Sequence, residues 1–367
     1  MKVLVATDTF KGSLTSYEAG VAICEGIHRA VPSAELSVHE IADGGEGTFE
    51  VVTAALGGKV CSIQVTGPLG EPVDAHYGIA GNTAVMDISR ACGLPLVPPE
   101  KRDPMTTTTR GAGEMILDAL GRGCRKFIIG IGGSSTNDCG AGMLQALGVK
   151  ILDDNGKPVK PGAAGLADAR SVDTHDIDPR IIDSEFLIAC DVNNPLTGAN
   201  GCSMIFAPQK GAGKDSCIKM DGYIRHFASL TDGDPSYPGA GAAGGLGFAF
   251  RTFLNGKLKP GAELIIEQTG LDERMKDADI VITGEGCLDS QTSMGKVPSV
   301  MAKHAKSYGA RVMVFAGCVK ADAGELAAMG IDEAFSISDN VTNEESMKNA
   351  AALLAQKAYE VFDGRSI

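Results

Sequence analysis

The sequence lacks the features that would point to a membrane, a nucleic acid or a disulfide framework. No apolar run approaches the ~20 residues of a membrane-spanning helix, and Asp8 comes too early for a signal peptide. Lysine and arginine total 33 against 46 acids, without any basic cluster, which disfavours nucleic-acid and anionic membrane partners. The ten cysteines are scattered without a CxxC pair. We therefore expect reduced thiols and a cytoplasmic location.

The common catalytic motifs are also missing. There is no GxxxxGK[ST] phosphate loop, no GxSxG elbow, no HExxH and no protein-kinase HRD or DFG set. The run "GAGAAG" (239–244) fits GxGxxG, but it follows "DPSYP" and not a strand, as a dinucleotide fingerprint would require. These absences exclude the usual Walker NTPase, serine hydrolase, metalloprotease and protein-kinase interpretations.

Strand and helix signals alternate at both ends of the chain. The N-terminal third offers "KVLVATD" as a strand, a helix over 16–30, "ELSVHEIAD" as a strand and a helix in "GGEGTFEVVTAAL". The C-terminal third offers strands in "DIVITGEG", "RVMVFAG" and "EAFSIS", with helices between them and one long helix over 343–362. Two N-terminal and three C-terminal strands predict one five-stranded, doubly wound parallel sheet.

The middle of the chain has a different texture and predicts an inserted domain. Its strand-like runs include "TAVMDIS", "KFIIGIGG", "EFLIACDV" and "CSMIFAP". The 367 residues suffice for about two ordinary domains. The prediction is an α/β protein in which a flavodoxin-like or Rossmann-like domain (1–58 and 272–367) is split around a second α/β domain (59–271). We expect the active site in the cleft between them.

Five loops share one design, in which an apolar strand is followed by glycines and then by acids, amides or hydroxyls. They are "ATDTFKGS", "ADGGEGT", "GIGGSSTNDCGAGM", "ACDVNNPLTG" and "ITGEGCLDSQTSMGKVP". Glycines let backbone N–H groups approach an anion, and Ser134, Ser135 and Thr136 add donors, as a phosphate-binding turn requires. Asn137 and Asp138 could instead cap the following helix. The two interpretations are compatible.

Acids and lysines recur in these loops. The acids are Asp8, Asp43, Glu46, Asp138, Asp191, Glu285 and Asp289, and the lysines are Lys11, Lys210 and Lys296. Phosphoryl transfer needs carboxylates to hold Mg²⁺, lysines to neutralise phosphate charge and a carboxylate to accept the hydroxyl proton. Any single acid is more simply a helix cap or a solvated turn, but seven together favour an enzyme that acts on phosphate.

At the same loops the chain resembles the bacterial glycerate kinase family of the glycerate 2-kinase type. The matching stretches are "TDTFKGSLTS", "IADGGEGT", "VTGPLGEPV", "KRDPMTTTTRGAGEMIL", "IIGIGGSSTNDCGAGM", "ACDVNNPLTG", "FAPQKGA", "PGAGAAGGLG" and "VITGEGCLDSQTSMGKVP". The resemblance implies ATP-dependent phosphorylation of D-glycerate to 2-phosphoglycerate. We expect ATP and Mg²⁺ as cofactors, and glycerate and ATP as small-molecule partners, with no nucleic acid and no membrane. The sequence does not indicate an oligomeric state.

Site residues follow from these loops. We expect Asp191 to be the general base, because Pro195 stiffens the turn after it, and we keep Asp43 as the alternate. The further catalytic residues are Lys11 and Lys296. The expected substrate contacts are Arg110, Ser134, Asn137, Asp138, Asn193 and Lys210. The expected nucleotide or phosphate contacts are Glu46, Gly132, Gly133, Ser135, Glu285, Gly286 and Gln291. Asp289 is expected to bind Mg²⁺ through ATP.

The chain departs from the family pattern at a few positions. Ser135 and Cys139 replace an alanine and a glycine, and Cys287 stands where an arginine is expected, which removes a guanidinium next to Glu285. Arg90 is also unusual at its position and could replace the missing charge, while Cys92 stands where smaller or hydroxyl residues are common. Two rival hypotheses remain, a non-catalytic sensor of glycerate or nucleotide and a kinase for a related hydroxy acid.

Overall fold

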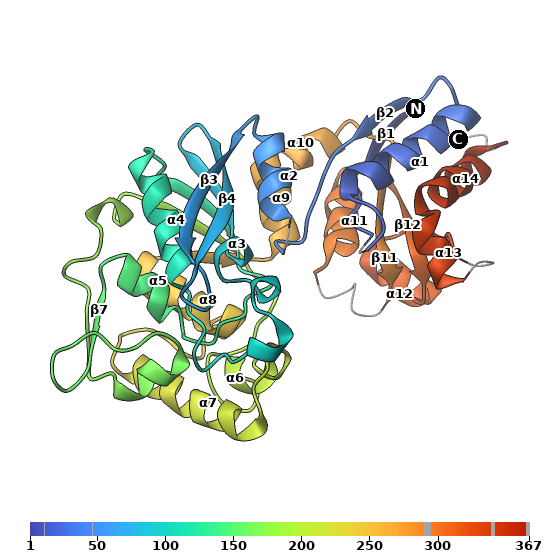
Figure 1. Cartoon of the computed structure of the whole chain (residues 1–367). Coiled ribbons are helices and arrows are strands. Elements are labelled where there is room, and N and C mark those ends of the chain that lie inside the picture. The colour runs from blue at the N-terminus through green and yellow to red at the C-terminus, as the bar shows by residue number, and fades with distance from the viewer. Residues whose placement is uncertain (11, 46, 290–294, 339–341, 365–367) are drawn as a thin grey trace. The chain divides into compact units, whose positions relative to one another are not determined.

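The computed structural model describes residues 1–10, 12–45, 47–289, 295–338 and 342–364. Its contacts divide the chain into two compact units (Figure 1). Unit 1 comprises Met1–Asp43 and Ala262–Ile367, and unit 2 comprises Gly44–Gly261. Both crossings lie earlier than the expected boundaries at 58 and 272. The first does so because helix α2 (Thr48–Ala55) packs on strands β4 and β5 of unit 2. The second does so because Glu263, before the expected boundary, already contacts His304 of unit 1. Among the described residues, no helix has the length and apolar character needed to cross a membrane.

Unit 1 is built on a parallel sheet, which is five-stranded in the described part of the chain, with the order β13-β12-β11-β1-β2. Its strands are β1 Lys2–Val5, β2 Glu35–Val38, β11 Ile280–Leu288, β12 Arg311–Val319 and β13 Glu333–Ser336. These are the two N-terminal and three C-terminal strands expected from the sequence. The mixed α/β class with parallel sheets is thereby confirmed.

Helices cover unit 1. They are α1 Ser16–Ala30, α9 Gly261–Thr269, α10 Leu271–Met275, α11 Val297–Ser307, α12 Ala323–Met329, α13 Asn343–Lys348 and α14 Ala350–Phe362. Helix α1 begins at the expected residue because Thr15 and Glu18 form a capping box. Apolar side chains of α1 and α14 share one core cluster with β1, β11 and β12. Figure 1 shows α11 on the other side of these strands.

Two sequence predictions of elements were wrong. The single helix expected over 343–362 is two helices, α13 and α14, which meet at Asn349. The strand-like run "CSMIFAP" contains helix α6 (Cys202–Ile205), which follows Gly201. Its apolar residues suit a buried strand or a short buried helix equally, and periodicity over so few residues does not separate the two.

Unit 2 holds a mixed sheet whose described strands run in the order β10-β9-β6-β5-β4-β3. Strands β3 to β5 pair antiparallel, whereas β5, β6, β9 and β10 are parallel. The strands are β3 Lys59–Thr66, β4 Pro72–Ala80, β5 Thr83–Asp87, β6 Lys126–Gly130, β9 Glu185–Ala189 and β10 Lys257–Lys259, with a separate hairpin of β7 Lys150–Leu152 and β8 Ser171–Asp173.

The helices of unit 2 pack around this sheet. Besides α2 and α6 they are α3 Ser89–Cys92, α4 Arg110–Gly121, α5 Ala141–Ala146, α7 Lys214–Ser229 and α8 Leu246–Leu254. Short 3₁₀ turns complete the unit: η1 Leu94–Leu96, η2 Pro99–Lys101, η3 Ala163–Asp168, η4 Pro179–Ile181, η5 Pro208–Lys210 and η6 Ala242–Gly245. Because β5, β6 and β9 are neighbouring parallel strands, their carboxyl ends lie side by side, and each is followed by a polar loop.

Candidate active site

A pocket of about 500 Å³ lies at the carboxyl edge of the unit 1 sheet. Loops at this edge of an open α/β sheet form its usual binding crevice. The charged side chains that line this unit 1 pocket are Asp8, Asp43, Glu285, Asp289, Lys296 and Lys320. The structure thus brings together five of the predicted site residues: Asp43, Glu285, Gly286, Asp289 and Lys296.

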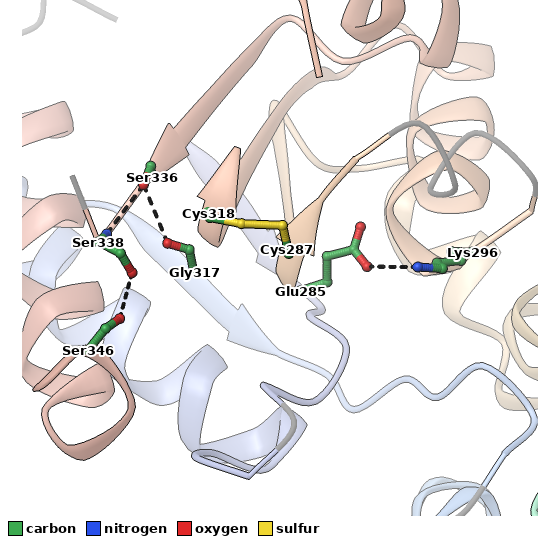
Figure 2. The surroundings of a disulfide bond; sticks show 8 residues. All are labelled: Glu285, Cys287, Lys296, Gly317, Cys318, Ser336, Ser338 and Ser346. Carbon is green, nitrogen blue, oxygen red and sulfur yellow. Dashed lines mark hydrogen bonds and ion pairs between the residues drawn. A yellow bond between two sulfur atoms is a disulfide. The ribbon is translucent and has the colours of Figure 1, made fainter. Parts of the chain in front are cut away.

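Glu285 and Lys296 form an ion pair inside this pocket, with 3.9 Å between Lys296 Nζ and Glu285 Oε2 (Figure 2). Glu285 belongs to β11 and its side chain is 8% exposed, whereas the Lys296 side chain is 41% exposed. Lys296 stands at the N-cap of α11, whose first turn presents backbone N–H groups. An exposed ammonium beside a helix N-terminus can receive a phosphate group.

Three predicted site residues lie outside the described residues: Lys11, Glu46 and Gln291. Sequence reasoning did not select Lys320 or Ser338, which also line the unit 1 pocket. Each lies just beyond the end of a strand, β12 for Lys320 and β13 for Ser338. The signal that could have found them was the strand-end rule itself, applied to "GCVKAD" and "FSISD".

The loop after β6 in unit 2 is buried and not open. Ser134, Ser135, Asn137 and Asp138 are all at most 7% exposed, whereas Gly133 is exposed. Ser135 donates its hydroxyl to Cys92 O at 2.9 Å. Asn137 Nδ2 donates to Ser203 Oγ at 2.8 Å. Of the predicted phosphate donors of this loop, the Ser135 hydroxyl is therefore engaged within the protein, and all three hydroxyls are buried.

Asp138 is engaged by the surrounding backbone and by Thr109. Its Oδ2 accepts from Thr109 N and Thr109 Oγ1 at 2.9 Å and from Gly142 N at 3.2 Å, and its Oδ1 accepts from Gly140 N at 3.2 Å. Burial raises the pKa of Asp138, and these hydrogen bonds oppose the increase. Asp138 thus accepts from backbone N–H groups at the start of α5, although the N-cap residue of this helix is Gly140 and not Asp138.

Lys210 reaches this loop from the η5 turn, 2% exposed. Its Nζ donates to Ser134 Oγ at 2.8 Å and to Thr136 O at 2.7 Å. Burial lowers the pKa of Lys210 to about 8. Two buried acceptors of the same loop, Thr136 Oγ1 and Asn137 Oδ1, have no hydrogen-bond partner. Lys210 therefore clamps the loop from within, and its ammonium is not open to solvent.

The exposed candidates of unit 2 lie around this buried loop. Asp191 and Asn193 follow β9 and are exposed. Asp191 Oδ1 accepts from Gly261 N at 2.7 Å, so the carboxylate is oriented by the start of α9. Arg110 opens α4 and its Nε donates to Glu114 Oε1 at 3.0 Å. Asp191 thus has the rigid support that an acid–base group needs, and also the turn-capping contact of the simpler interpretation.

Asp87, at the end of β5, was missed by sequence reasoning. It is 1% exposed, and its Oδ2 accepts from Gly47 N at 3.0 Å, at the N-cap of α2. Burial, with the nearby Glu50 carboxylate, raises the pKa of Asp87 to about 7. The strand-like run "TAVMDIS" contains this acid, but its partner Gly47 lies 40 residues away. Buried acids with raised pKa values are common at functional sites.

Glycines bring the segment that follows Asp43 close to the strand ends of unit 2. A Cβ on Gly44 would lie 2.6 Å from Ala189 Cβ, and one on Gly130 would lie 2.6 Å from Gly44 O. Gly44 also has φ +87°, which disfavours other residues. The backbone at Gly44 therefore runs directly against the ends of β6 and β9, beside Asp87.

One expectation about the cysteines was wrong. Cys287 and Cys318 are linked by a disulfide, whereas the other eight cysteines are free. The pair comes from opposed positions of β11 and β12, and both residues line the unit 1 pocket (Figure 2). Sequence spacing could not reveal this pairing, because strand register places the two residues together.

Comparison with known proteins decides the family. The model of the glycerate kinase family matches residues 3–364. The chain belongs to the glycerate kinase family. A glycerate kinase of Halalkalibacterium halodurans is 43% identical over 98% of this chain and 97% of its own length. A glycerate 2-kinase of Escherichia coli is 45% identical over 95% and 94% of the two chains.

A solved structure supports the same assignment. A crystal structure assigned as glycerate kinase 2 from Salmonella typhimurium matches with a TM-score of 0.89 and 41% identity, covering 99% of this chain and 97% of that one. The family resemblance expected from the sequence motifs is confirmed, and the protein is a kinase enzyme.

Proposed function

We propose that this kinase uses ATP to phosphorylate D-glycerate, giving 2-phosphoglycerate and ADP. The observation that carries the proposal is the 45% identity, over nearly the whole chain, with the E. coli protein named glycerate 2-kinase. The lysines and carboxylates that line the unit 1 pocket support it, because they are the groups that phosphoryl transfer requires. Because cells keep their ATP in the cytoplasm, we place the reaction there.

The unit 1 pocket is proposed to bind the nucleotide. Lys296, as an exposed point charge, neutralises the phosphates, and the N-terminus of α11 supplies further positive potential. Glu285 holds the Lys296 ammonium through their ion pair. Lys11, Glu46 and Gln291 remain predicted contacts, as does the backbone of Gly286.

The carboxylates of the unit 1 pocket have the chemistry to bind a Mg²⁺ ion that enters together with the nucleotide. Carboxylate oxygens are its preferred protein ligands, and Asp43 and Asp289 line the pocket. In the described part of the chain, no group of three or more His, Cys, Asp or Glu could hold a metal by itself. The bound ion would offset the charge of the transferring phosphate. We assign Asp289 as its protein ligand.

Unit 2 is proposed to act on glycerate. Asp191, held by Gly261 N, accepts the proton of the attacking hydroxyl, while Asn193 and Arg110 orient the substrate. The buried residues Ser134, Asn137, Asp138 and Lys210 act in this proposal by fixing the loop whose exposed turn at Gly133 faces solvent. Rigid support of this kind matters for catalysis, because misplacement by about 1 Å can cost about 10²-fold in rate.

An ADP-release assay with D-glycerate tests the proposal. Product identity follows from ³¹P NMR, or from enolase, which accepts 2-phosphoglycerate. L-glycerate, lactate and tartronate serve as the substrate panel. ADP release that requires D-glycerate and yields the 2-phosphate supports the proposal. Release with another hydroxy acid alone would favour the related kinase, and nucleotide binding without any turnover would favour the sensor.

A further inference from the structure

The disulfide lies in the wall of the unit 1 pocket. Cys287 on β11 and Cys318 on β12 are opposed in the parallel register, with Cα atoms 4.6 Å apart. This separation lies inside the range that disulfides need. Glu285 and Cys287 are two residues apart on β11, so they share one face of the strand, and both line the pocket. Figure 2 shows the disulfide next to the Glu285–Lys296 ion pair.

This pair differs from the other cysteines in its surroundings. Both linked cysteines are half-buried at the pocket, so small thiols and disulfides in solution can reach them. Six of the eight free cysteines are buried. Cys24 on α1 is half-buried, but burial raises its pKa to about 11, which keeps it in the unreactive thiol form. Thiol–disulfide exchange requires access as well as thiolate.

The Cys287–Cys318 disulfide lies next to a part of the sheet in which both strands carry a glycine. The ladder pairs Glu285 with Ala316 and then Cys287 with Cys318, and between these pairs stand Gly286 and Gly317. A Cβ on Gly317 would lie 2.3 Å from Gly286 O, so the two backbones are in close contact. Glycine weakens a strand because it brings no side chain to pack and loses more entropy on ordering. The disulfide therefore fixes two strand ends that glycines leave adaptable.

Gly317 also connects the disulfide to the neighbouring strand, β13. Ser336 Oγ of β13 donates to Gly317 O at 3.4 Å, and Ser338 N donates to Ser336 Oγ at 3.3 Å (Figure 2). Ser338 Oγ and Ser346 Oγ lie 2.6 Å apart. Since Gly317, Ser338 and Ser346 all line the pocket, these hydrogen bonds connect the end of β12 with a second wall of the pocket.

We propose that Cys287 and Cys318 form a reversible redox-modification site, and that formation of their disulfide strengthens binding of a nucleoside triphosphate in the unit 1 pocket. The inference rests on the proposed nucleotide role of this pocket. The linked state holds both strand ends in the binding geometry, so less freedom is lost when the ligand binds. By linkage, the ligand must stabilise the disulfide by the same factor.

The exchange chemistry is balanced with a low-molecular-weight disulfide, such as oxidised glutathione, as the oxidant. One cysteine thiolate attacks it, forms a mixed disulfide and releases one glutathione thiolate. The second cysteine thiolate attacks the protein sulfur of that mixed disulfide, forms the Cys287–Cys318 bond and releases the second glutathione. Two electrons and two protons leave the protein. A soluble dithiol reduces the bond in two exchanges of its own: one of its thiolates attacks the protein disulfide, and its second thiolate then resolves the mixed disulfide, which leaves two protein thiols and an oxidised dithiol.

The test compares the full-length protein in its two redox states. One sample is oxidised with glutathione disulfide and the other is reduced with dithiothreitol and desalted without oxygen. Peptide mass spectrometry verifies the link in each sample. The Kd of ATP, measured by calorimetry, should be about three- to tenfold higher in the reduced sample, as expected for lost preorganisation. Saturating ATP should shift the glutathione redox equilibrium of the pair toward the disulfide by the same factor.

Variants make the test specific. Cys318→Ser and Cys287→Ser should each abolish the difference between oxidising and reducing treatment. Cys24→Ser, in a half-buried cysteine of α1 outside the pocket, should retain it. Equal ATP affinity in the two states overturns the proposal, as does a redox response that persists in Cys318→Ser, or a pair that glutathione disulfide cannot link. Turnover of glycerate is a separate readout, so a failed kinase assay with an intact redox shift would refute only the proposed acceptor.

Discussion

The polar loops of unit 1 and unit 2 share a sequence design but differ in what surrounds them. In unit 1 the strand ends open into a pocket, and the Lys296 side chain there is 41% exposed. In unit 2 the loop after β6 is buried, and Lys210 is 2% exposed with its ammonium bonded to that loop. Glycines, acids and hydroxyls after strands therefore identify the sheet edges at which candidate site residues lie. They do not distinguish groups that contact a ligand from groups that support the loop.

Removal of divalent cations has the largest expected effect on the unit 1 side of this comparison. Without the ion, the charge of the transferring phosphate is not offset. We expect activity to fall to background after EDTA treatment and desalting, and to return with MgCl₂ but not with KCl of equal ionic strength. Initial rates of ADP release measure this. Full activity in the chelated, desalted enzyme would contradict it.

Asp191→Asn tests the exposed side of unit 2. The amide keeps an oxygen that can accept from Gly261 N, so the local turn should survive, but it cannot take a proton. We expect kcat to fall by about 10²–10⁴-fold while ATP and glycerate affinities stay within a few fold. Steady-state kinetics and calorimetry measure the two quantities.

The matched control is Asp215→Asn, which changes an exposed acid at the start of α7 and should leave kcat unaltered. If Asp191→Asn turns over normally, Asp191 only caps the turn before α9. If it loses only its affinity for Mg²⁺-ATP, the base is another residue, and Asp43 becomes the first choice.

Lys296→Met tests the exposed lysine of the unit 1 pocket, which contrasts with the buried Lys210 of unit 2. Loss of one preorganised charged donor should cost about 2–4 kcal/mol of transition-state stabilisation, seen as a lower kcat/KM. Lys303→Met, in the same helix and exposed, is the control and should remain near wild type. A Lys296→Met enzyme with wild-type kcat/KM would show that this lysine does not contact the phosphates.

The sequence predicted the strands of the unit 1 sheet well, because strands follow from local patterns. Apolar runs such as that of β11 predict strands, although β11 continues through "GEG" to Leu288. Helix α1 spans the range expected from the sequence, since Thr15 and Glu18 form its cap within the local sequence.

The remaining features depend on residues far apart in the chain. Lys210 reaches Ser134 across 76 positions, so the local sequence around either residue does not reveal the buried clamp. The disulfide joins cysteines 31 positions apart through the register of β11 and β12. Asp87 was missed for the same reason, because tertiary packing supplies its partner.

Asp87→Asn has the smallest expected effect. It tests whether a buried carboxyl of unit 2 makes the free energy of unfolding depend on pH. The pKa of Asp87 is raised to about 7 from an ordinary value of 3.8, because the carboxyl is buried near Glu50. The folded state therefore holds its proton up to a higher pH than the unfolded state does. The stability that this group contributes is fully present below about pH 4 and is lost as the pH rises through about 7.

The variant removes this titration and keeps an acceptor for Gly47 N. Between about pH 5 and 7.5, the wild type should lose about 2 kcal/mol of unfolding free energy relative to Asp87→Asn. Urea unfolding at both pH values measures this difference. Asp183→Asn, at an exposed acid of the same unit, should follow the wild-type slope. Equal pH slopes for the wild type and Asp87→Asn would mean that solvent reaches this carboxylate, and the contrast between the open unit 1 pocket and the closed strand ends of unit 2 would then be smaller than the structure indicates.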